Sequence, residues 1–132
     1  MAGSLAVAGQ RITAAWMNQN IPGAWTPITP QNGWTNHGSG SPTFQARFLN
    51  SAVLQIIGNL NPGTTTSGTV IGTLPNASMF PISTQQSLGV ILTGTGAGSP
   101  FEVTVFNNGA IEIGALGGAT YVSINILINM DV

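Results

Sequence analysis

The nine residues YVSINILIN, at positions 121–129, carry the clearest structural signal in this chain. Every second residue from Val122 to Ile128 is aliphatic, and Tyr121, Ser123 and Asn125 alternate with them. Successive side chains of a β-strand point to opposite faces, so this pattern predicts a strand with one buried face and one more polar face.

Shorter runs of the same kind precede this segment, at residues 43–50, 52–60, 69–74 and 88–93. Among the 132 residues, 18 glycines and 8 prolines separate the apolar runs, as expected when short strands are joined by tight turns. About eight strands at this spacing predict an all-β fold, specifically an antiparallel β-sandwich of jelly-roll-like type.

The segment FEVTVFNNGAIEIG, at residues 101–114, predicts a hairpin whose register follows from its polarity. A two-residue loop at Asn108–Gly109 would pair Val105 with Glu112 and would mix polar and apolar groups on each face. A three-residue loop with a left-handed Gly109 instead pairs Val105 with Ile111, and the acidic side chains then share the opposite face. We therefore predict the three-residue loop.

Residues 11–20, RITAAWMNQN, are the one helix candidate, because apolar side chains recur at helical spacing and Pro22 would end the helix. A helix this short must pack on its own domain or on a neighbour. We expect residues 1–23 to form an N-terminal arm with this short helical segment, used for attachment or oligomer contact. Residues 24–132 are expected to form the β-sandwich domain.

Charged residues make up only 4% of the chain, against about 25% in a typical soluble protein. Disorder does not explain this composition, because 42% of the residues are hydrophobic and can bury a core. The surface must therefore be built largely from neutral polar residues and glycine, which favours association. We expect copies of the chain or a larger assembly to cover much of it.

Several function classes are disfavoured by the composition. Two arginines cannot neutralise a run of phosphates, so no nucleic-acid binding is expected. The chain has no cysteine and one histidine, which does not match a zinc site, and we expect neither a metal nor a cofactor. No run approaches the ~18 apolar residues of a membrane span, so membrane insertion is not expected.

Catalysis has two weak candidates. A Ser-His-Asp site would need His37 together with Asp131 at the far end of the chain, and no G-x-S-x-G motif is present. The predicted hairpin places Glu102 and Glu112 diagonally, about 7–8 Å apart, which permits the paired carboxylates of a glycosidase. An open polar sheet face is equally the place for solubilising charges. We assign no catalytic residue and expect no enzyme.

The binding candidates are Trp34, Asn36, His37 and Tyr121, because flat rings stack on sugars while amides bond sugar hydroxyls. Trp25 lies in an apparent strand and is expected in the core. Trp34 lies between Asn32-Gly33 and Asn36, so it is expected to be the exposed ring. The alternative is that residues 25–42 form an architectural strand-turn-strand edge of the sandwich.

Five segments in this order resemble a module of tailed-bacteriophage tail-fibre, minor tail and related virion proteins. They are AWTPITPQNGWTNHGSG, QARFLNSAVLQIIGNL, SGTVIGTLP, VTVFNNGAIEIG and TYVSINILI, and together they span roughly residues 24–130. Trp25, Trp34, Arg47 and Tyr121 match residues of the family pattern. The resemblance implies a compact antiparallel β-sandwich that commonly assembles as a trimer on the virion surface.

Two functions follow from these observations. The first is a non-enzymatic virion surface protein, a tail-fibre-tip or receptor-binding module whose copies contact host-surface saccharide or protein. The second is a capsid-decorating or head-fibre structural protein. In both, the partners are further copies of the chain, as a homotrimer, and other virion proteins held through the N-terminal segment.

Overall fold

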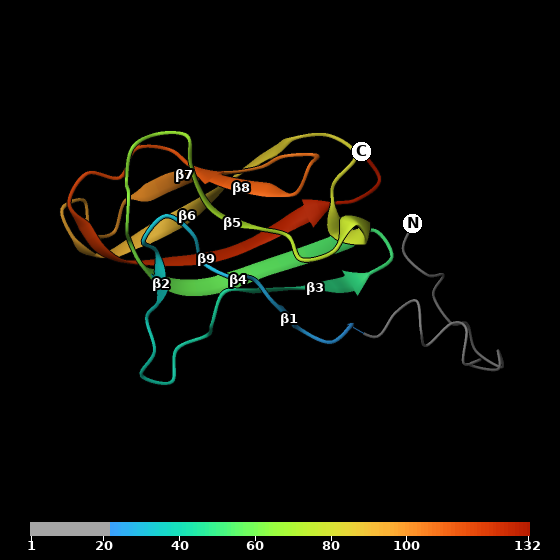
Figure 1. Cartoon of the computed structure of the whole chain (residues 1–132), viewed down its shortest axis with the longest axis horizontal. Helices are drawn as coiled ribbons and strands as arrows, with labels where there is room; N and C mark the ends of the chain where they lie inside the picture. The colour runs from blue at the N-terminus through green and yellow to red at the C-terminus, as the bar shows by residue number, and fades with distance from the viewer. Residues whose placement is uncertain (1–21) are drawn as a thin grey trace, which may run out of the picture.

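The computed structural model describes residues 22–132, and the predicted helix at 11–20 lies outside them. The strands are β1 (Thr26–Pro27), β2 (Thr35–Asn36), β3 (Gln45–Asn50), β4 (Val53–Asn61), β5 (Thr69–Thr73), β6 (Gln85–Gly94), β7 (Pro100–Val105), β8 (Ala110–Ile113) and β9 (Ala119–Asn129). A single 3₁₀ turn, η1 (Ala77–Met79), precedes β6, and it is the only helical element among the described residues (Figure 1).

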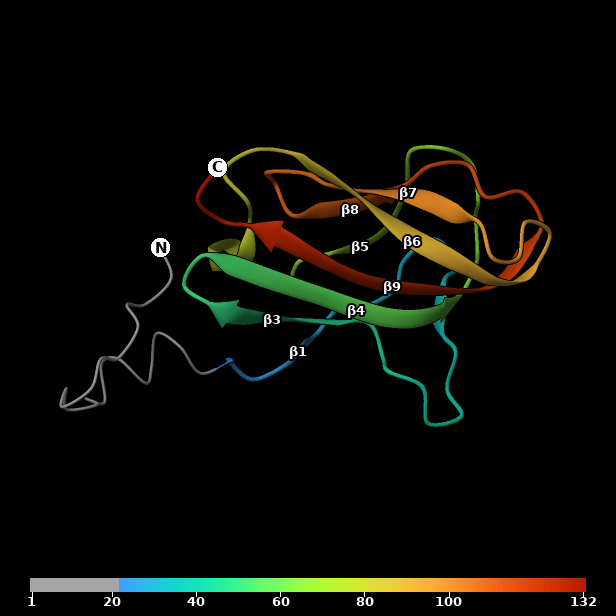
Figure 2. The same ribbon diagram turned by 180° about the vertical axis from the view of Figure 1, so that it is seen from behind.

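All the strand pairs are antiparallel and belong to one nine-stranded sheet of order β1-β3-β4-β9-β6-β7-β8-β5, with β2 paired to β4. The sheet folds over on itself into two layers, as Figures 1 and 2 show from opposite sides. Strand β6 joins the layers, because it is hydrogen-bonded to β9 on one edge and to β7 on the other. The prediction of an antiparallel all-β sandwich is confirmed, and its two layers are parts of one curled sheet.

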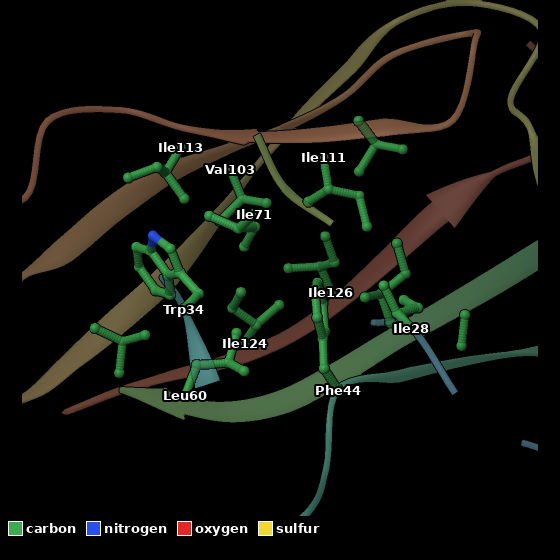
Figure 3. Packing of buried hydrophobic residues seen from close by; sticks show 14 of the residues in the cluster. Ile28, Trp34, Phe44, Leu60, Ile71, Val103, Ile111, Ile113, Ile124 and Ile126 are labelled. Carbon is green, nitrogen blue, oxygen red and sulfur yellow. The ribbon is translucent and has the colours of Figure 1, made fainter. Parts of the chain in front are cut away.

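The core lies between the two layers. Along β9, the side chains of Val122, Ile124, Ile126 and Ile128 are buried, as the alternation predicted. They face aliphatic side chains of the other layer, including Val103, Ile111 and Ile113 (Figure 3). Close packing of such side chains supplies most of the stabilisation in a domain of this size.

The Phe44 ring lies in this core and requires a glycine at one position on β4 and at one position on β5. Gly58 on β4 and Gly72 on β5 lie against the ring. A Cβ atom at Gly72 would lie 2.6 Å from Phe44 Cε2, which no real contact allows. Glycine in a strand interior normally weakens the strand, and here it makes room for an aromatic ring.

The hairpin of β7 and β8 has the predicted register. Val105 pairs with Ile111, Val103 pairs with Ile113, and all four side chains are buried. The three-residue loop closes through a hydrogen bond from Gly109 N to Phe106 O of 2.9 Å, and Gly109 has φ +86°. The outer face of the hairpin carries the two glutamates of the chain, as expected.

The two ends of the strand order, β1 and β5, are covered in different ways. The segment after β1 passes along the free edge of β5, where Gln31 N donates to Ile71 O at 2.8 Å. Asn32 Nδ2 donates to the carbonyl oxygen of Val70 on the same edge, at 2.6 Å. Strand β1 itself has only two residues, one of which is Pro27.

Candidate functional site

Trp34 is a core residue, so the prediction of an exposed ring at this position is wrong. Its side chain is only 3% exposed and packs among Ile71, Ile113 and Ile124 (Figure 3). The turn at Asn32-Gly33, where both residues have positive φ, reverses the chain so that the next side chain points inward. The indole N–H donates to Thr64 O at 2.8 Å, which satisfies its one polar atom.

Trp25 has the environment that was predicted for Trp34. It is half-buried beside β1 on the outer face of the sheet, with the guanidinium carbon of Arg47 4.3 Å from its ring centroid. The expectation of a core position for Trp25 is therefore also wrong. Strand β1 lies at the edge of the sheet, where one face of a tryptophan can remain open to solvent.

His37 and Tyr121 lie face to face, although 83 residues separate them in the sequence. Their ring centroids are 3.8 Å apart and the ring planes differ by 7°. Tyr121 is on the outer face of β9. His37 follows β2 directly, and its backbone N donates to Asn59 O on β4 at 2.9 Å, which extends the β2–β4 pairing and fixes the imidazole above the end of β4.

Four polar side chains complete what we call the His37–Tyr121 cluster: Ser41, Asn59, Asn61 and Ser123. Asn61 Oδ1 lies 2.8 Å from His37 Nδ1, and because an amide oxygen only accepts, Nδ1 donates this hydrogen bond. The Tyr121 hydroxyl accepts from Asn59 Nδ2 at 2.8 Å. These bonds hold both rings in fixed orientations.

The loop between β2 and β3 borders the cluster and projects from the sandwich (Figures 1 and 2). Ser41 in this loop reaches the Tyr121 hydroxyl at 3.3 Å. Asn36 braces the base of the loop, because its Oδ1 accepts the backbone N–H of Phe44 at 2.8 Å. The structure thus brings His37 and Tyr121 together, gives Asn36 a supporting position beside them, and removes Trp34 from the surface.

The hydrogen bonds of the cluster involve no carboxylate. His37 has an amide as its hydrogen-bond partner, where a general base of the triad type has a carboxylate. The cluster can offer a ligand two kinds of contact. Its amides and hydroxyls can form hydrogen bonds, and its stacked rings give an apolar surface, which together suit a ligand rich in hydroxyl groups. Saccharides have these properties.

The two glutamates lie elsewhere, on the outer face of the β7–β8 hairpin. Glu112 pairs with Thr104, so Glu102 is its diagonal neighbour, as predicted. Glu102 is exposed, and its Oε1 accepts from Gln86 Nε2 at 3.0 Å. Within residues 22–132 no three His, Cys, Asp or Glu side chains gather to hold a metal. No helix in that range is long and apolar enough to cross a bilayer.

Sequence reasoning missed Asn59, Asn61, Ser41 and Ser123 as members of the cluster. Asn59 and Ser123 are directly paired across β4 and β9, and both strands show the alternation that would place them outward. The missing information was which strands are neighbours, because no local pattern tells that β4 pairs with β9.

No protein-family model and no curated protein sequence matches the chain. Among solved structures, it is similar to the receptor-binding protein of Listeria phage PSA, with a TM-score of 0.64 and 18% identity over 88% of this chain and 70% of that one. It is also similar to the head domain of lactococcal phage bIL170, with a TM-score of 0.59 and 21% identity over 81% of this chain and 97% of that one. Over these shares of its length, the chain therefore has the fold of the two phage proteins.

Proposed function

We propose that the chain is a non-enzymatic receptor-binding module on the surface of a phage particle, placed at the tip of a tail fibre. The observation that carries this proposal is the His37–Tyr121 cluster, a rigid pair of rings surrounded by amides and hydroxyls at one end of the sandwich. The fold likeness to two proteins described as phage receptor-binding proteins or head domains supports the same function.

The ligand we propose for this cluster is a neutral saccharide of the host surface. An outer face of the stacked pair can pack against the C–H groups of a sugar, and the amide and hydroxyl groups around the rings can exchange hydrogen bonds with its hydroxyls. Because hydrogen bonds to the two rings or to each other fix Asn59, Asn61 and the two serines, little side-chain entropy is lost when the ligand binds.

Binding of the full chain to an immobilised panel of glycans tests this site. Tyr121→Ala removes one ring of the stack and should weaken binding by at least about fivefold, the loss typical of a central contact residue. Thr104→Ala, on the outer face of β7, is the matched control and should bind as the unchanged chain does. Equal binding by the Tyr121 variant, or no binding by any chain, would contradict the proposal.

We also propose that the chain forms a homotrimer through the part of the outer face of β6 around Leu88. Leu88, Val90 and Leu92 on β6, with Leu127 on β9, are among the large apolar side chains that the described residues leave exposed. Both Leu88 and Leu127 are 59% exposed. A trimer contact centred on Leu88 would leave Tyr121 and Ser123, which lie beside Thr93 and Val90, open to solvent, and would present several weak saccharide sites at once, which raises avidity.

The assembly and its location have separate tests. Light scattering should give three times the chain mass, and a stable monomer at micromolar concentration would contradict the trimer. In intact particles, labelled chain should be found at the tail tip, held by other virion proteins through residues 1–23. Label on the capsomers would instead favour capsid decoration and would overturn the tail assignment.

A further inference from the structure

Arg47 on β3 is the only Lys or Arg of residues 22–132, and it lies on the outer face of the sheet. Its guanidinium stacks over the indole of Trp25, with 4.3 Å from Cζ to the ring centroid. No ion pair joins it to a carboxylate in this part of the chain. A half-buried cation in an almost uncharged protein thus has an aromatic ring and an amide as its neighbours.

Hydrogen bonds fix the direction in which Arg47 presents its donors. Its Nε donates to Gln55 Oε1 on β4 at 3.1 Å. Gln55 is oriented in turn, because its Nε2 donates to Asn125 Oδ1 on β9 at 3.2 Å. The guanidinium plane is therefore held by the indole and by one edge, and within residues 22–132 its two terminal nitrogens have no hydrogen-bond partner.

The two glutamates are on strands remote from β3 in the strand order. Glu102 is on β7, four positions from β3, and Glu112 is on β8, five positions away. Among residues 22–132 no salt bridge joins Arg47 to a carboxylate, and its described neighbours are an indole and an amide. An anion at Arg47 would therefore meet a positive charge that no paired carboxylate neutralises.

We propose that Arg47, Gln55 and Trp25 form an oxyanion-binding site for an acidic saccharide, one that carries a carboxylate or a phosphate. The two terminal nitrogens of Arg47 would donate a forked pair of hydrogen bonds to two oxygens of the anion. The half-exposed indole lies beside them and can contact the attached sugar ring.

This site is separate from the His37–Tyr121 cluster. Gln55 and Asn59 are four residues apart on β4, so the two sites are about 13 Å apart on the same face. Binding at the oxyanion site requires no ligand at the His37–Tyr121 cluster, and it is measured on different residues. An extended acidic saccharide could occupy both.

The test is a titration of the full-length, isotope-labelled chain followed by NMR at constant ionic strength. The observed signals are Arg47 Nε–H and the indole N–H of Trp25. The ligands are inorganic phosphate, glucose 6-phosphate, glucuronate and glucose. Saturable shifts at both signals with glucose 6-phosphate or glucuronate support the site, and the stronger of the two identifies the favoured anion.

Variants separate the forked geometry from charge alone. Arg47→Lys keeps the charge but loses the planar fork, and should weaken binding of the acidic sugars at least about tenfold. Arg47→Gln should abolish binding of the acidic sugars. If that variant does not fold, the affinity of the Arg47→Lys variant tests the site. Glu102→Gln, which changes a charge outside the site on the same sheet, should leave binding unchanged.

Three results would overturn the proposal. One is the absence of saturable shifts with every anion. The second is equal affinity of the Arg47→Lys variant and the unchanged chain, which would indicate simple charge attraction. The third is an equal response to glucose and to glucose 6-phosphate at these signals. Loss of neutral-glycan binding in the Tyr121 variant has no bearing on any of the three.

Discussion

Replacement of Trp34 by phenylalanine measures how much of the stability depends on this buried ring. The substitution removes the hydrogen bond from the indole to Thr64 O, a contribution of about 1 kcal/mol. It also leaves a space where part of the indole was, and we take about 1–2 kcal/mol for that space, a fraction of the 3–5 kcal/mol for complete truncation. The expected loss in the free energy of unfolding is thus about 2–3 kcal/mol, or about 10 °C in Tm.

Trp25→Phe is the matched control for that measurement. Trp25 is half-buried, and its main described contact is the stacked guanidinium of Arg47, so its loss should be below about 1 kcal/mol. Urea unfolding followed by far-UV circular dichroism gives both values, and equal m-values would show that the variants unfold from similar native states. Two results would refute the assignment of Trp34 to the core and Trp25 to the surface. One is a free energy of unfolding for Trp34→Phe within about 0.5 kcal/mol of the parent, and the other is a larger loss for Trp25→Phe than for Trp34→Phe.

Three further substitutions, one of them with a matched control, have definite expected outcomes. Gly109→Ala should lower the free energy of unfolding by about 2–4 kcal/mol, because φ is +86° and the new Cβ would lie 2.3 Å from Phe80 Cε1. The control is Gly98→Ala, where φ is +85° and the space around the new Cβ is open. It should lose only about 1–2 kcal/mol, from backbone strain. Thermal melts of the pair check this, and equal losses would refute the role of the clash. Leu88→Asn should change monomer stability by less than about 0.5 kcal/mol yet shift light scattering towards smaller species; unchanged assembly would exclude this face. Asn59→Ala should lower Tm by a few degrees, the effect of losing about 1 kcal/mol of hydrogen bonding to Tyr121, and an unchanged Tm would show that the bond contributes nothing.

The strands and the hairpin register were predictable because their signals are local. In the β7–β8 hairpin, only one loop length places Val105 opposite Ile111 and keeps both glutamates outside, and the structure has that pairing. The burial of Val122 to Ile128 on β9 likewise follows from alternation alone.

The two tryptophans show where local reasoning fails. Trp34 is flanked by polar residues, yet it is buried in the core, where a carbonyl thirty residues later satisfies its N–H. Trp25 is exposed on one side because its strand is at the edge of the sheet, which depends on the strand order. The His37–Tyr121 stack depends on the same information, since β4 lies between β2 and β9 and brings the two rings above it.

The way in which the edges of the curled sheet are protected explains how a protein with so little charge avoids pairing of its edge strands with other chains. Many β proteins place lysines on edge strands to repel other chains, and this chain has none. Here the backbone of Gln31 and the amide of Asn32 occupy carbonyl groups along β5, while the other margin is two residues long and contains a proline. Main-chain contacts and a proline thus protect the sheet edges in place of charged side chains. Substitutions that loosen residues 28–32 should therefore promote aggregation before they affect any binding site.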